Sequence, residues 1–466
     1  MVFSSPAFLF FFLPAVYLVC RVLPGIRSRN AWLAAASLVF YAAGQSAYAL
    51  LLLLSAAMNY LAGLLLMRGR AKKAVLAVFV AGNLLLLGTF KYLDFFVRTL
   101  NAAAGLSLPE TGITLPIGIS FYTFQGLSYV IDVYRDPRAG TKRFGKLLLY
   151  IAFFPQLIAG PIIKYHDIER QLDERGATPE LTLLGLRRFI AGLGKKLLCA
   201  DTLGAVASAV FAMGADELDM RLAWLGAVCY TLQIYFDFSG YSDMAVGLGA
   251  LFGFTLPENF RLPYTALSVR EFWRRWHITL SAWFRDYLYI PLGGNRAGRA
   301  RTVRNKVIVF ALTGLWHGAN WTFLLWGLWH GAFASLEDAG VVPKRLTRSR
   351  FGHVYTMLVV VPGFVLFRAD TLADAARMLS QMFAGVSFTA AHTLALRALL
   401  DARTAFVLLA AALLAVGAPQ RLMEMSARRF PRAHRCAGAA AYAAVLALCV
   451  LAMANMTFSP FIYYQF

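Results

Sequence analysis

Residues 47–67 read AYALLLLLSAAMNYLAGLLLM, and RGRAKK follows directly at residues 68–73. The first stretch contains no charged side chain and is long enough to cross the hydrocarbon core of a bilayer, which takes about 20 apolar residues in a helix. Clusters of Lys and Arg mark the loops that stay on the cytosolic side. The stretch therefore predicts a membrane-spanning helix that ends at the cytosolic face.

The same pattern of apolar runs separated by short basic loops continues through the chain. Clear candidate spans are residues 6–23, 47–67, 74–97, 115–133, 223–251, 306–336, 355–367, 405–418 and 437–457, and shorter candidates are 32–43, 147–163, 183–211 and 372–384. We expect an all-α integral membrane protein with about 11 transmembrane helices. A single polytopic membrane domain would cover residues 1–466, with its motif-bearing core at roughly 115–336.

The composition supports a membrane protein and argues against other classes. Hydrophobic residues make up 59% of the chain and charged residues only 15%, whereas soluble proteins carry about a quarter charged residues. The net charge of +21 arises mostly from the loops between apolar runs, so it does not indicate nucleic-acid binding. The first cation, Arg21, follows the first apolar run, which predicts an uncleaved N-terminus that lies outside.

One short apolar segment, residues 147–163, contains Pro155, Gly160 and Pro161. These residues interrupt a helix, and irregular backbone at membrane depth is tolerated only against protein or a water-filled cavity. We expect a segment that enters and leaves on the same face and lines a cavity.

The segment from residue 270 to residue 294 is too charged to span lipid, and it is rich in aromatic residues. Trp273, Trp276, Leu280 and Trp283 recur at helical spacing, which predicts a helix in the interface or dipping into the protein interior. The segment also carries Arg270, Arg274, Arg275 and Arg285. Their guanidinium groups can bind the phosphates of an acyl donor or reach lipid headgroups, and the sequence leaves both readings open.

Two histidines lie where polar groups are costly, so each is a candidate functional residue. His317 stands in the apolar stretch LTGLWHGANWTFLLW (312–326), and His277 stands among the arginines and tryptophans. A neutral imidazole can take a proton from an attacking hydroxyl and return it later. Asn320, three residues after His317, would share its helical face and orient the ring. The alternative for a lone His is a structural hydrogen bond to a neighbouring helix.

A third polar cluster contains Asp237 and Asp243, which must be paired, protonated or hydrated at membrane depth. Interhelical hydrogen bonding explains the cluster better than a metal site, because the oxygen ligands are few, and we expect no metal. The sequence has no nucleophile elbow, phosphate-binding glycine loop or zinc-ligand spacing. Acyl transfer needs only a positioned base, aligned substrates and dipoles for the oxyanion.

Several long motifs resemble the membrane-bound O-acyltransferase family, bacterial alginate O-acetyltransferase type, along nearly the whole chain. They are LPIGISFYTFQ (115–125), FPQLIAGP (154–161), YFDFSGYSDMA (235–245), ENFRLPY (258–264), EFWRRWH (271–277), DYLYIPLGG (286–294), GLWHG (314–318) and the ending FIYYQF (461–466). The resemblance implies a bundle of many helices, with re-entrant or in-plane helices, around a central tunnel in the bacterial inner membrane.

The resemblance also implies roles for individual residues. His317 would be the catalytic base and His277 the second motif histidine, with Asn259, Asn320 and Asp243 as orienting or oxyanion-stabilising residues. Arg270, Arg274, Arg275 and Arg285 would bind the donor.

The resemblance implies substrates as well. The acyl group would come from a cytosolic thioester, acetyl-CoA or an acyl-carrier protein, and no cofactor would stay bound. The acceptor would be an exported polysaccharide such as alginate, or a periplasmic relay protein. The similar D-alanyl transfer proteins of teichoic acid synthesis leave another acyl group open.

Two other classes of function compete with acyl transfer. A lipid or sugar transporter would use the same polar clusters to line a substrate route and would not consume a thioester. A scaffold of a secretion complex would tolerate substitution of both His317 and His277.

Overall fold

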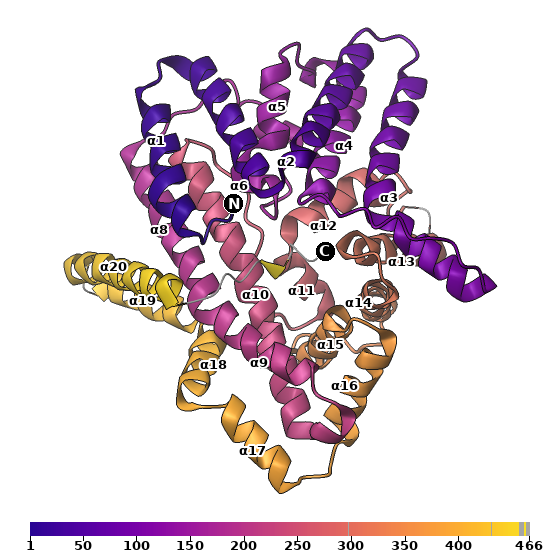
Figure 1. Ribbon diagram of the computed structural model, residues 1–466, viewed down its shortest axis with the longest axis vertical. Helices are drawn as coiled ribbons and strands as arrows, with labels where there is room; N and C mark the ends of the chain where they lie inside the picture. Colours follow the sequence, from indigo (N-terminus) through magenta and orange to yellow (C-terminus); the bar gives the residue numbers. More distant parts are fainter. Residues whose placement is uncertain (297, 430, 456–460, 463–466) are drawn as a thin grey trace. The chain divides into compact units, whose positions relative to one another are not determined.

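The computed structural model describes residues 1–296, 298–429, 431–455 and 461–462, and all its regular elements are helices. These residues form two compact units. Unit 1 contains residues Met1–Phe189 and Ser242–Pro257, and unit 2 contains Ile190–Tyr241 and Glu258–Phe466. Figure 1 shows the helices of each unit in sequence colours.

Unit 1 is built mainly on three long helices that pack against one another, α2, α3 and α4 (Figure 1). Its helices are α1 (Leu13–Val22), α2 (Gly25–Met67), α3 (Lys72–Ala104), α4 (Ile119–Arg135), α5 (Phe144–Ala152), α6 (Phe154–Leu157), α7 (Tyr165–Ile168) and most of α8 (Pro179–Gly194), with the short turns η1 (Phe8–Phe12) and η2 (Pro137–Ala139). The two candidate spans at residues 32–43 and 47–67 belong to α2, whose backbone leaves helical geometry at Gln45. The Gln45 side chain links this break to the loop before α4, since its Oε1 accepts a hydrogen bond from Ile117 N at 2.7 Å.

A pair of asparagines joins α2 to α3 in the interior of unit 1. Asn59 Nδ2 donates to Asn83 Oδ1 at 3.2 Å, and Asn83 Nδ2 donates to Asn59 Oδ1 at 2.9 Å. Both side chains are fully buried in otherwise apolar helices. Each amide satisfies the other, so two polar side chains are accommodated within the apolar runs that predicted these helices.

The predicted interruption in residues 147–163 is present. Helix α5 ends at Ala152, Phe153 leaves helical geometry, and α6 is a single turn from Phe154 to Leu157. Pro155 lies in the first turn of α6, where its missing N–H costs no helical hydrogen bond. The prediction that this segment lines a cavity stays a prediction.

A short helix of unit 1 carries a histidine held between two carboxylates. His166 in α7 lies 2.9 Å from Asp132 Oδ2 through Nδ1 and 3.2 Å from Asp167 Oδ1 through Nε2. The hydrogen bonds to Asp132 and Asp167 raise the pKa of His166 from 6.5 to about 9. The imidazolium therefore fastens α7 to the end of α4 at neutral pH.

Unit 2 contains the remaining helices (Figure 1). They are α9 (Asp201–Phe211), most of α10 (Met220–Leu251), α11 (Val269–Arg275), α12 (Ile278–Phe284), α13 (Arg299–His317), α14 (Trp321–Ala339), α15 (Phe351–Arg368), α16 (Leu372–Ala384), α17 (Ala390–Leu399), α18 (Ala402–Ala415), α19 (Ala418–Arg429) and α20 (Pro431–Asn455), with the short turns η3 (Lys195–Ala200), η4 (Ala215–Glu217), η5 (Pro263–Thr265) and η6 (Arg285–Tyr289).

The candidate span at residues 306–336 is two helices and not one. Helix α13 ends at His317 because Gly318 has extended backbone angles, and α14 begins at Trp321 with Asn320 as its N-cap. The two helices pack closely, since a Cβ atom on Gly314 would collide with the carbonyl of Phe323. On Gly327 a Cβ atom would collide with the carbonyl of Phe310. Glycines at the contact permit this close approach.

A buried ionic triad joins α10 to η3 and α9. Lys196 Nζ lies 2.7 Å from Asp237 Oδ1 and 2.8 Å from Asp201 Oδ1, and all three side chains are almost fully buried. The other Asp237 oxygen accepts a hydrogen bond from the backbone N–H of Ile462 at 2.8 Å. Asp237 is thus paired, which resolves the three alternatives left by the sequence in favour of an ion pair.

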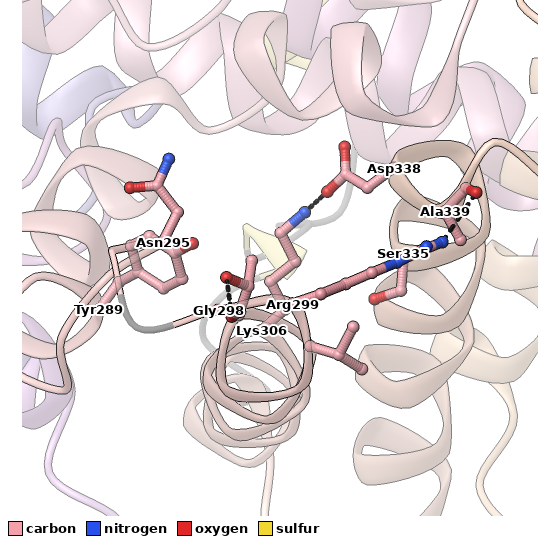
Figure 2. A pocket seen from close by; sticks show the side chains of 10 residues that line it. Tyr289, Asn295, Gly298, Arg299, Lys306, Ser335, Asp338 and Ala339 are labelled. Carbon is pink, nitrogen blue, oxygen red and sulfur yellow. Dashed lines mark hydrogen bonds and ion pairs between the residues drawn. The ribbon is translucent and has the colours of Figure 1, made fainter.

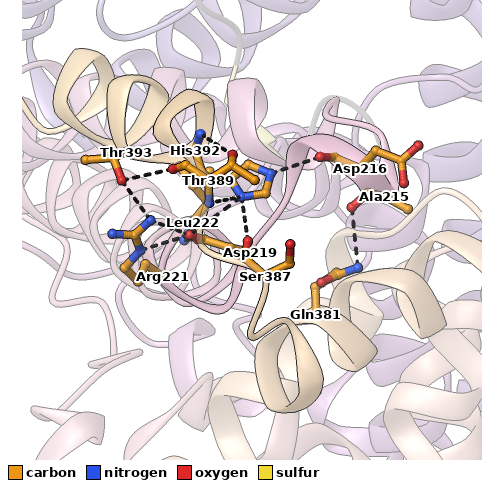
Figure 3. A network of polar contacts seen from close by, with 10 residues as sticks. All are labelled: Ala215, Asp216, Asp219, Arg221, Leu222, Gln381, Ser387, Thr389, His392 and Thr393. Carbon is orange, nitrogen blue, oxygen red and sulfur yellow. Dashed lines mark hydrogen bonds and ion pairs between the residues drawn. The ribbon is translucent and has the colours of Figure 1, made fainter.

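A second polar network joins the turn before α10 to the turn before α17 (Figure 3). Asp219 caps α10 by accepting from Leu222 N at 2.9 Å, and it pairs with Arg221 at 2.6 Å. Both ring nitrogens of His392 contact carbonyl oxygens, those of Ser387 and Asp216, at 2.7 and 2.9 Å. The network fixes two loops against each other with hydrogen bonds.

Within the described residues, four helices have the length and apolar character that a bilayer crossing requires. They are Gly25–Met67, Lys72–Ala104, Phe351–Arg368 and Cys436–Ala454, and the bent pair Ala390–Leu399 and Ala402–Ala415 makes a fifth if it is one span. The expected number of about 11 membrane helices stays a prediction.

Candidate active site

The tryptophan- and arginine-rich segment is not the continuous helix that its spacing predicted. Helix α11 ends at Arg275, and α12 begins only at Ile278. Between them, His277 adopts a left-handed backbone conformation with φ of +44°, which a side chain with a Cβ rarely takes. Such strain persists where the surroundings hold it and is typical of functional sites.

Asn259 holds the break in place through its backbone and its side chain. The backbone carbonyl of Asn259 accepts from Ile278 N at 3.0 Å. Its side-chain Oδ1 accepts from the Thr279 N–H at 3.3 Å and from the Thr279 hydroxyl at 2.9 Å. A backbone N–H can only donate, so the Asn259 atom that faces it is the carbonyl oxygen of the amide.

This assignment determines the protonation of His277. The same Asn259 Oδ1 lies 3.1 Å from His277 Nδ1, and because that oxygen only accepts, Nδ1 carries the hydrogen. The other ring nitrogen, Nε2, then presents a lone pair in the neutral imidazole. Nε2 is buried and has no hydrogen-bond partner among the described residues. The structure thus fixes the tautomer of the neutral imidazole, with Nδ1 as its donor and Nε2 as its acceptor.

His317 lies beside His277 although the two residues come from different helices. Their ring centroids are 6.1 Å apart and their planes are steeply inclined. His277 is 0% exposed and His317 is 2% exposed. Two imidazoles of an apolar chain therefore meet in the interior of unit 2.

Aromatic rings enclose the histidine pair. Trp316, Trp326 and Phe367 contact His317 at centroid distances of 4.9, 5.0 and 5.2 Å. Phe238 lies edge-on to His277 at 4.6 Å. Such walls exclude water and strengthen electrostatic interactions inside the site.

The structure places Asn320 differently from the prediction. Asn320 does not share a helical face with His317, because Gly318 ends α13 between them. The Asn320 side chain accepts from Thr322 N at 3.3 Å and donates to the carbonyl of Asp370 at 2.8 Å. It caps α14 and supports the site through the helix start.

Asp243 belongs to unit 1 and is ion-paired. Arg188 donates to Asp243 Oδ1 through Nε at 3.1 Å and through Nη2 at 2.9 Å. Like Asp237, it therefore has a cation as its partner.

Three of the four candidate donor-binding arginines already contact carboxylates. Arg270 pairs with Glu337 at 3.2 Å and Asp338 at 2.6 Å. The other two contacts join Arg275 to Glu271 at 2.6 Å and Arg285 to Asp286 at 2.7 Å. Arg274 is exposed. Their proposed role in binding a donor stays a prediction.

Sequence reasoning did not assign a role to Thr279, Glu337 or His330. His330 is fully buried in α14, with its ring 5.4 Å from both Trp273 and Trp326. Trp326 therefore lies between His330 and His317. The sequence does carry a signal for His330, since Trp-His-Gly occurs both at residues 316–318 and at residues 329–331. The first copy lies at the end of α13 and the second within α14.

Comparisons with known proteins identify the family of this chain. Residues 141–342, which contain both His277 and His317, match the sequence profile of the membrane-bound O-acyltransferase family. The chain is 40% identical to a probable alginate O-acetylase of Azotobacter vinelandii, with 100% of both chains covered. It is 45% identical to the protein of that name in Pseudomonas aeruginosa, over 82% of this chain and 75% of the relative. A peptidoglycan O-acetyltransferase of Helicobacter pylori is 35% identical, over 82% of this chain and 80% of the relative. This chain belongs to the membrane-bound O-acyltransferase family and is an O-acyltransferase.

Proposed function

We propose that the protein transfers an acetyl group from a cytosolic thioester to a hydroxyl group of an exported polysaccharide such as alginate, or to a periplasmic relay protein that serves it. The bacterial inner membrane would hold the enzyme. The observation that carries the proposal is the buried pair of His277 and His317, with Asn259 fixing the His277 tautomer. The names of the relatives, which act on alginate and peptidoglycan, support a polymer of the cell envelope or an exported polymer as the final acceptor.

His317 is the proposed general base. Its imidazole takes the proton of the acceptor hydroxyl while the hydroxyl oxygen attacks the thioester carbonyl carbon. The new C–O bond forms, the C–S bond breaks, and the thiolate leaves with the proton that His317 held. One proton passes from acceptor to leaving group, so the histidine returns to its starting state.

His277 is the proposed partner of this base. Its Nε2 lone pair can accept a hydrogen bond from an N–H or O–H group that faces it in the site. Asn259 holds the ring hydrogen on Nδ1, so the hydrogen does not move to Nε2. The surrounding rings exclude water, which would otherwise hydrolyse the thioester without transfer.

The proposal is tested with purified protein in vesicles that receive acetyl-CoA on one side and polysaccharide or relay protein on the other. His317→Ala should lower acceptor-dependent thioester consumption by roughly 10²–10⁴. A matched control is His353→Ala, at a half-exposed histidine near the start of α15. If an intact sugar or lipid crosses the membrane with no loss of thioester, a transporter is the better description.

A further inference from the structure

A cleft of about 20 Å³ lies in unit 1, where three segments of the chain meet. Its walls come from the end of α1 with the start of α2, from the loop before α8 and from the end of α10. The lining residues fall within 17–29, 175–177 and 251–252. A site for one water molecule takes about 10–15 Å³, so the cleft admits one small group, such as a single oxygen atom of a larger anion.

The cleft is lined by cations that the protein does not neutralise. Three of its nine lining residues are arginines, Arg21, Arg29 and Arg175, and none is acidic. Within the residues that the structure describes, none of the three pairs with a carboxylate. We call this site the arginine cleft. A concave site lined by charges of one sign attracts the opposite charge, so the arginine cleft favours an anion.

Backbone carbonyls position two of these arginines. Arg21 Nη1 donates to the carbonyl of Ala177 at 3.0 Å, and Arg29 Nε donates to the carbonyl of Leu23 at 3.0 Å. A carbonyl group orients a guanidinium group without cancelling its charge, and each contact uses only one of the five N–H donors. Both arginines therefore keep donors for a ligand.

Arg175 has a buried donor group that the protein does not use. Its Nε and Nη1 donate to the carbonyls of Phe252 and Gln171 at 3.0 and 3.1 Å, and its guanidinium carbon lies 3.9 Å from the centre of the Phe254 ring. Its Nη2 is buried and has no hydrogen-bond partner among the described residues. Burial also lowers the pKa of Arg175 to about 10. A buried N–H without an acceptor is costly, so an anionic oxygen beside Nη2 would be stabilising.

The larger cavity at the start of α13 differs in this respect. Figure 2 shows Lys306 of that cavity reaching the carboxylate of Asp338, with which it pairs. The charge of this lysine is therefore balanced within the protein, whereas the charges of the arginine cleft are not.

The arginine cleft should lie at the cytosolic surface of the membrane. Its first two arginines follow the first apolar run of the chain, and basic loops of this kind stay in the cytosol. On α1, Leu18 and Val22 are 62% and 83% exposed, and they lie one turn apart on one face of the helix. Leu18 is also three residues from Arg21, so this apolar stripe adjoins the cations. An acyl chain along the stripe would bring a lipid phosphate to the arginine cleft.

We infer that the arginine cleft binds the phosphate of an anionic lipid of the cytosolic leaflet, with one phosphate oxygen at Arg175 Nη2 and the others at Arg21 and Arg29. Guanidinium groups bind phosphate oxygens through charge-assisted hydrogen bonds, and basic pockets between membrane helices bind anionic headgroups. The bound lipid joins the end of α1 to the loop before α8 and to the end of α10, and it stabilises unit 1. The inference does not depend on the proposed acyl transfer.

The test is the unfolding temperature of the purified full-length protein in detergent, measured while phosphatidylglycerol is added. The lipid should raise the unfolding temperature to a plateau, and the half-saturating concentration reports the affinity. Arg29→Gln should raise that concentration by about fivefold, which is the contribution of one arginine near an anionic headgroup. Arg21→Gln should act in the same direction, and it changes an exposed side chain, so the test does not depend on a single variant that folds.

Arg27→Gln is the matched control. Arg27 lies two residues before Arg29 on α2, is exposed and does not line the arginine cleft, so this variant should titrate as the wild type does. If Arg27→Gln instead weakens the response as much as Arg29→Gln, general surface charge binds the lipid and the inference is wrong.

Two further ligands separate the parts of the lipid. Phosphatidylcholine has the phosphate and the acyl chains but no net charge, and it should stabilise the protein less than phosphatidylglycerol does. Equal stabilisation by phosphatidylcholine would overturn the assignment to an anionic lipid. Inorganic phosphate has no acyl chain and should have no effect at the concentrations at which phosphatidylglycerol acts. If it stabilises the protein equally at those concentrations, free phosphate is the ligand and the assignment to a lipid is wrong.

Discussion

Replacing Asn259 with leucine should damage the candidate active site more than the similar shapes of the two side chains suggest. Leucine has the same branched arrangement of heavy atoms as asparagine, with bulkier methyl groups, but offers no acceptor. Asn259 Oδ1 accepts three hydrogen bonds, from His277 Nδ1, Thr279 N and the Thr279 hydroxyl. The hydroxyl can rotate to another acceptor, but the imidazole and backbone N–H groups cannot. Each buried donor left without a partner costs about 1–3 kcal/mol, so the two together cost about 2–6 kcal/mol.

The activity should fall further than the stability. Without Asn259, the His277 proton can move to Nε2, which removes the acceptor that faces the site, and the strained backbone at His277 loses its anchor. The assays are thermal unfolding in detergent and acetyl transfer per correctly folded molecule. Thr279→Val is the matched control, because it deletes one donor and leaves the His277 contact intact, at a cost of about 0.5–1.5 kcal/mol. Wild-type turnover and unfolding temperature in Asn259→Leu would refute the tautomer argument.

Three further predictions concern the supports of the fold. His166 should stabilise the fold most below pH 6.5, and this effect should disappear as the pH rises through about 9, because the pKa of His166 is higher in the folded than in the unfolded protein. The measurement is the unfolding temperature of the wild type minus that of His166→Gln. A difference that does not change with pH would contradict this prediction. Gly327→Ala should destabilise the α13–α14 pair by about 1–3 kcal/mol, because its Cβ would meet the Phe310 carbonyl, whereas Gly438→Ala, which meets nothing within 4 Å, should not lower the unfolding temperature. Lys196→Met should lower the free energy of unfolding by about 3–5 kcal/mol, because it leaves the buried carboxylates of Asp201 and Asp237 without their cation. Near-normal stability of this variant against denaturant or heat would show that one of the two carboxylates is protonated.

Much of the architecture could be predicted from the sequence because each membrane helix is specified by its own residues. The apolar run 47–67 and the basic loop after it predict the second part of α2 and its end at Met67. The same local rule predicts α3 from residue 74 onward. Helix formation in an apolar run depends on local composition, so no knowledge of distant residues was needed.

The helix breaks at the candidate active site were harder to predict because they depend on distant residues. Residues 306–336 look like one apolar span, although Asn320 is a recognisable N-cap for the second helix. The left-handed turn at His277 has no local signal, since it is held by Asn259, 18 residues earlier. A periodicity argument cannot detect such an anchor.

The charged residues show the same limit. The arginines of residues 270–285 were correctly identified as a cluster, but the carboxylates that they contact include Glu337 and Asp338, more than 60 residues later. Which cations are available for a ligand therefore depends on pairings that only the folded chain reveals.

The most direct test of the account is the acetyl content of secreted polysaccharide in cells that carry wild-type protein, His317→Ala or His353→Ala at matched membrane levels. The account predicts that His317→Ala abolishes acetylation while polymer yield stays unchanged, and that His353→Ala behaves as wild type. Normal acetylation with His317→Ala would contradict catalysis at the buried histidine pair.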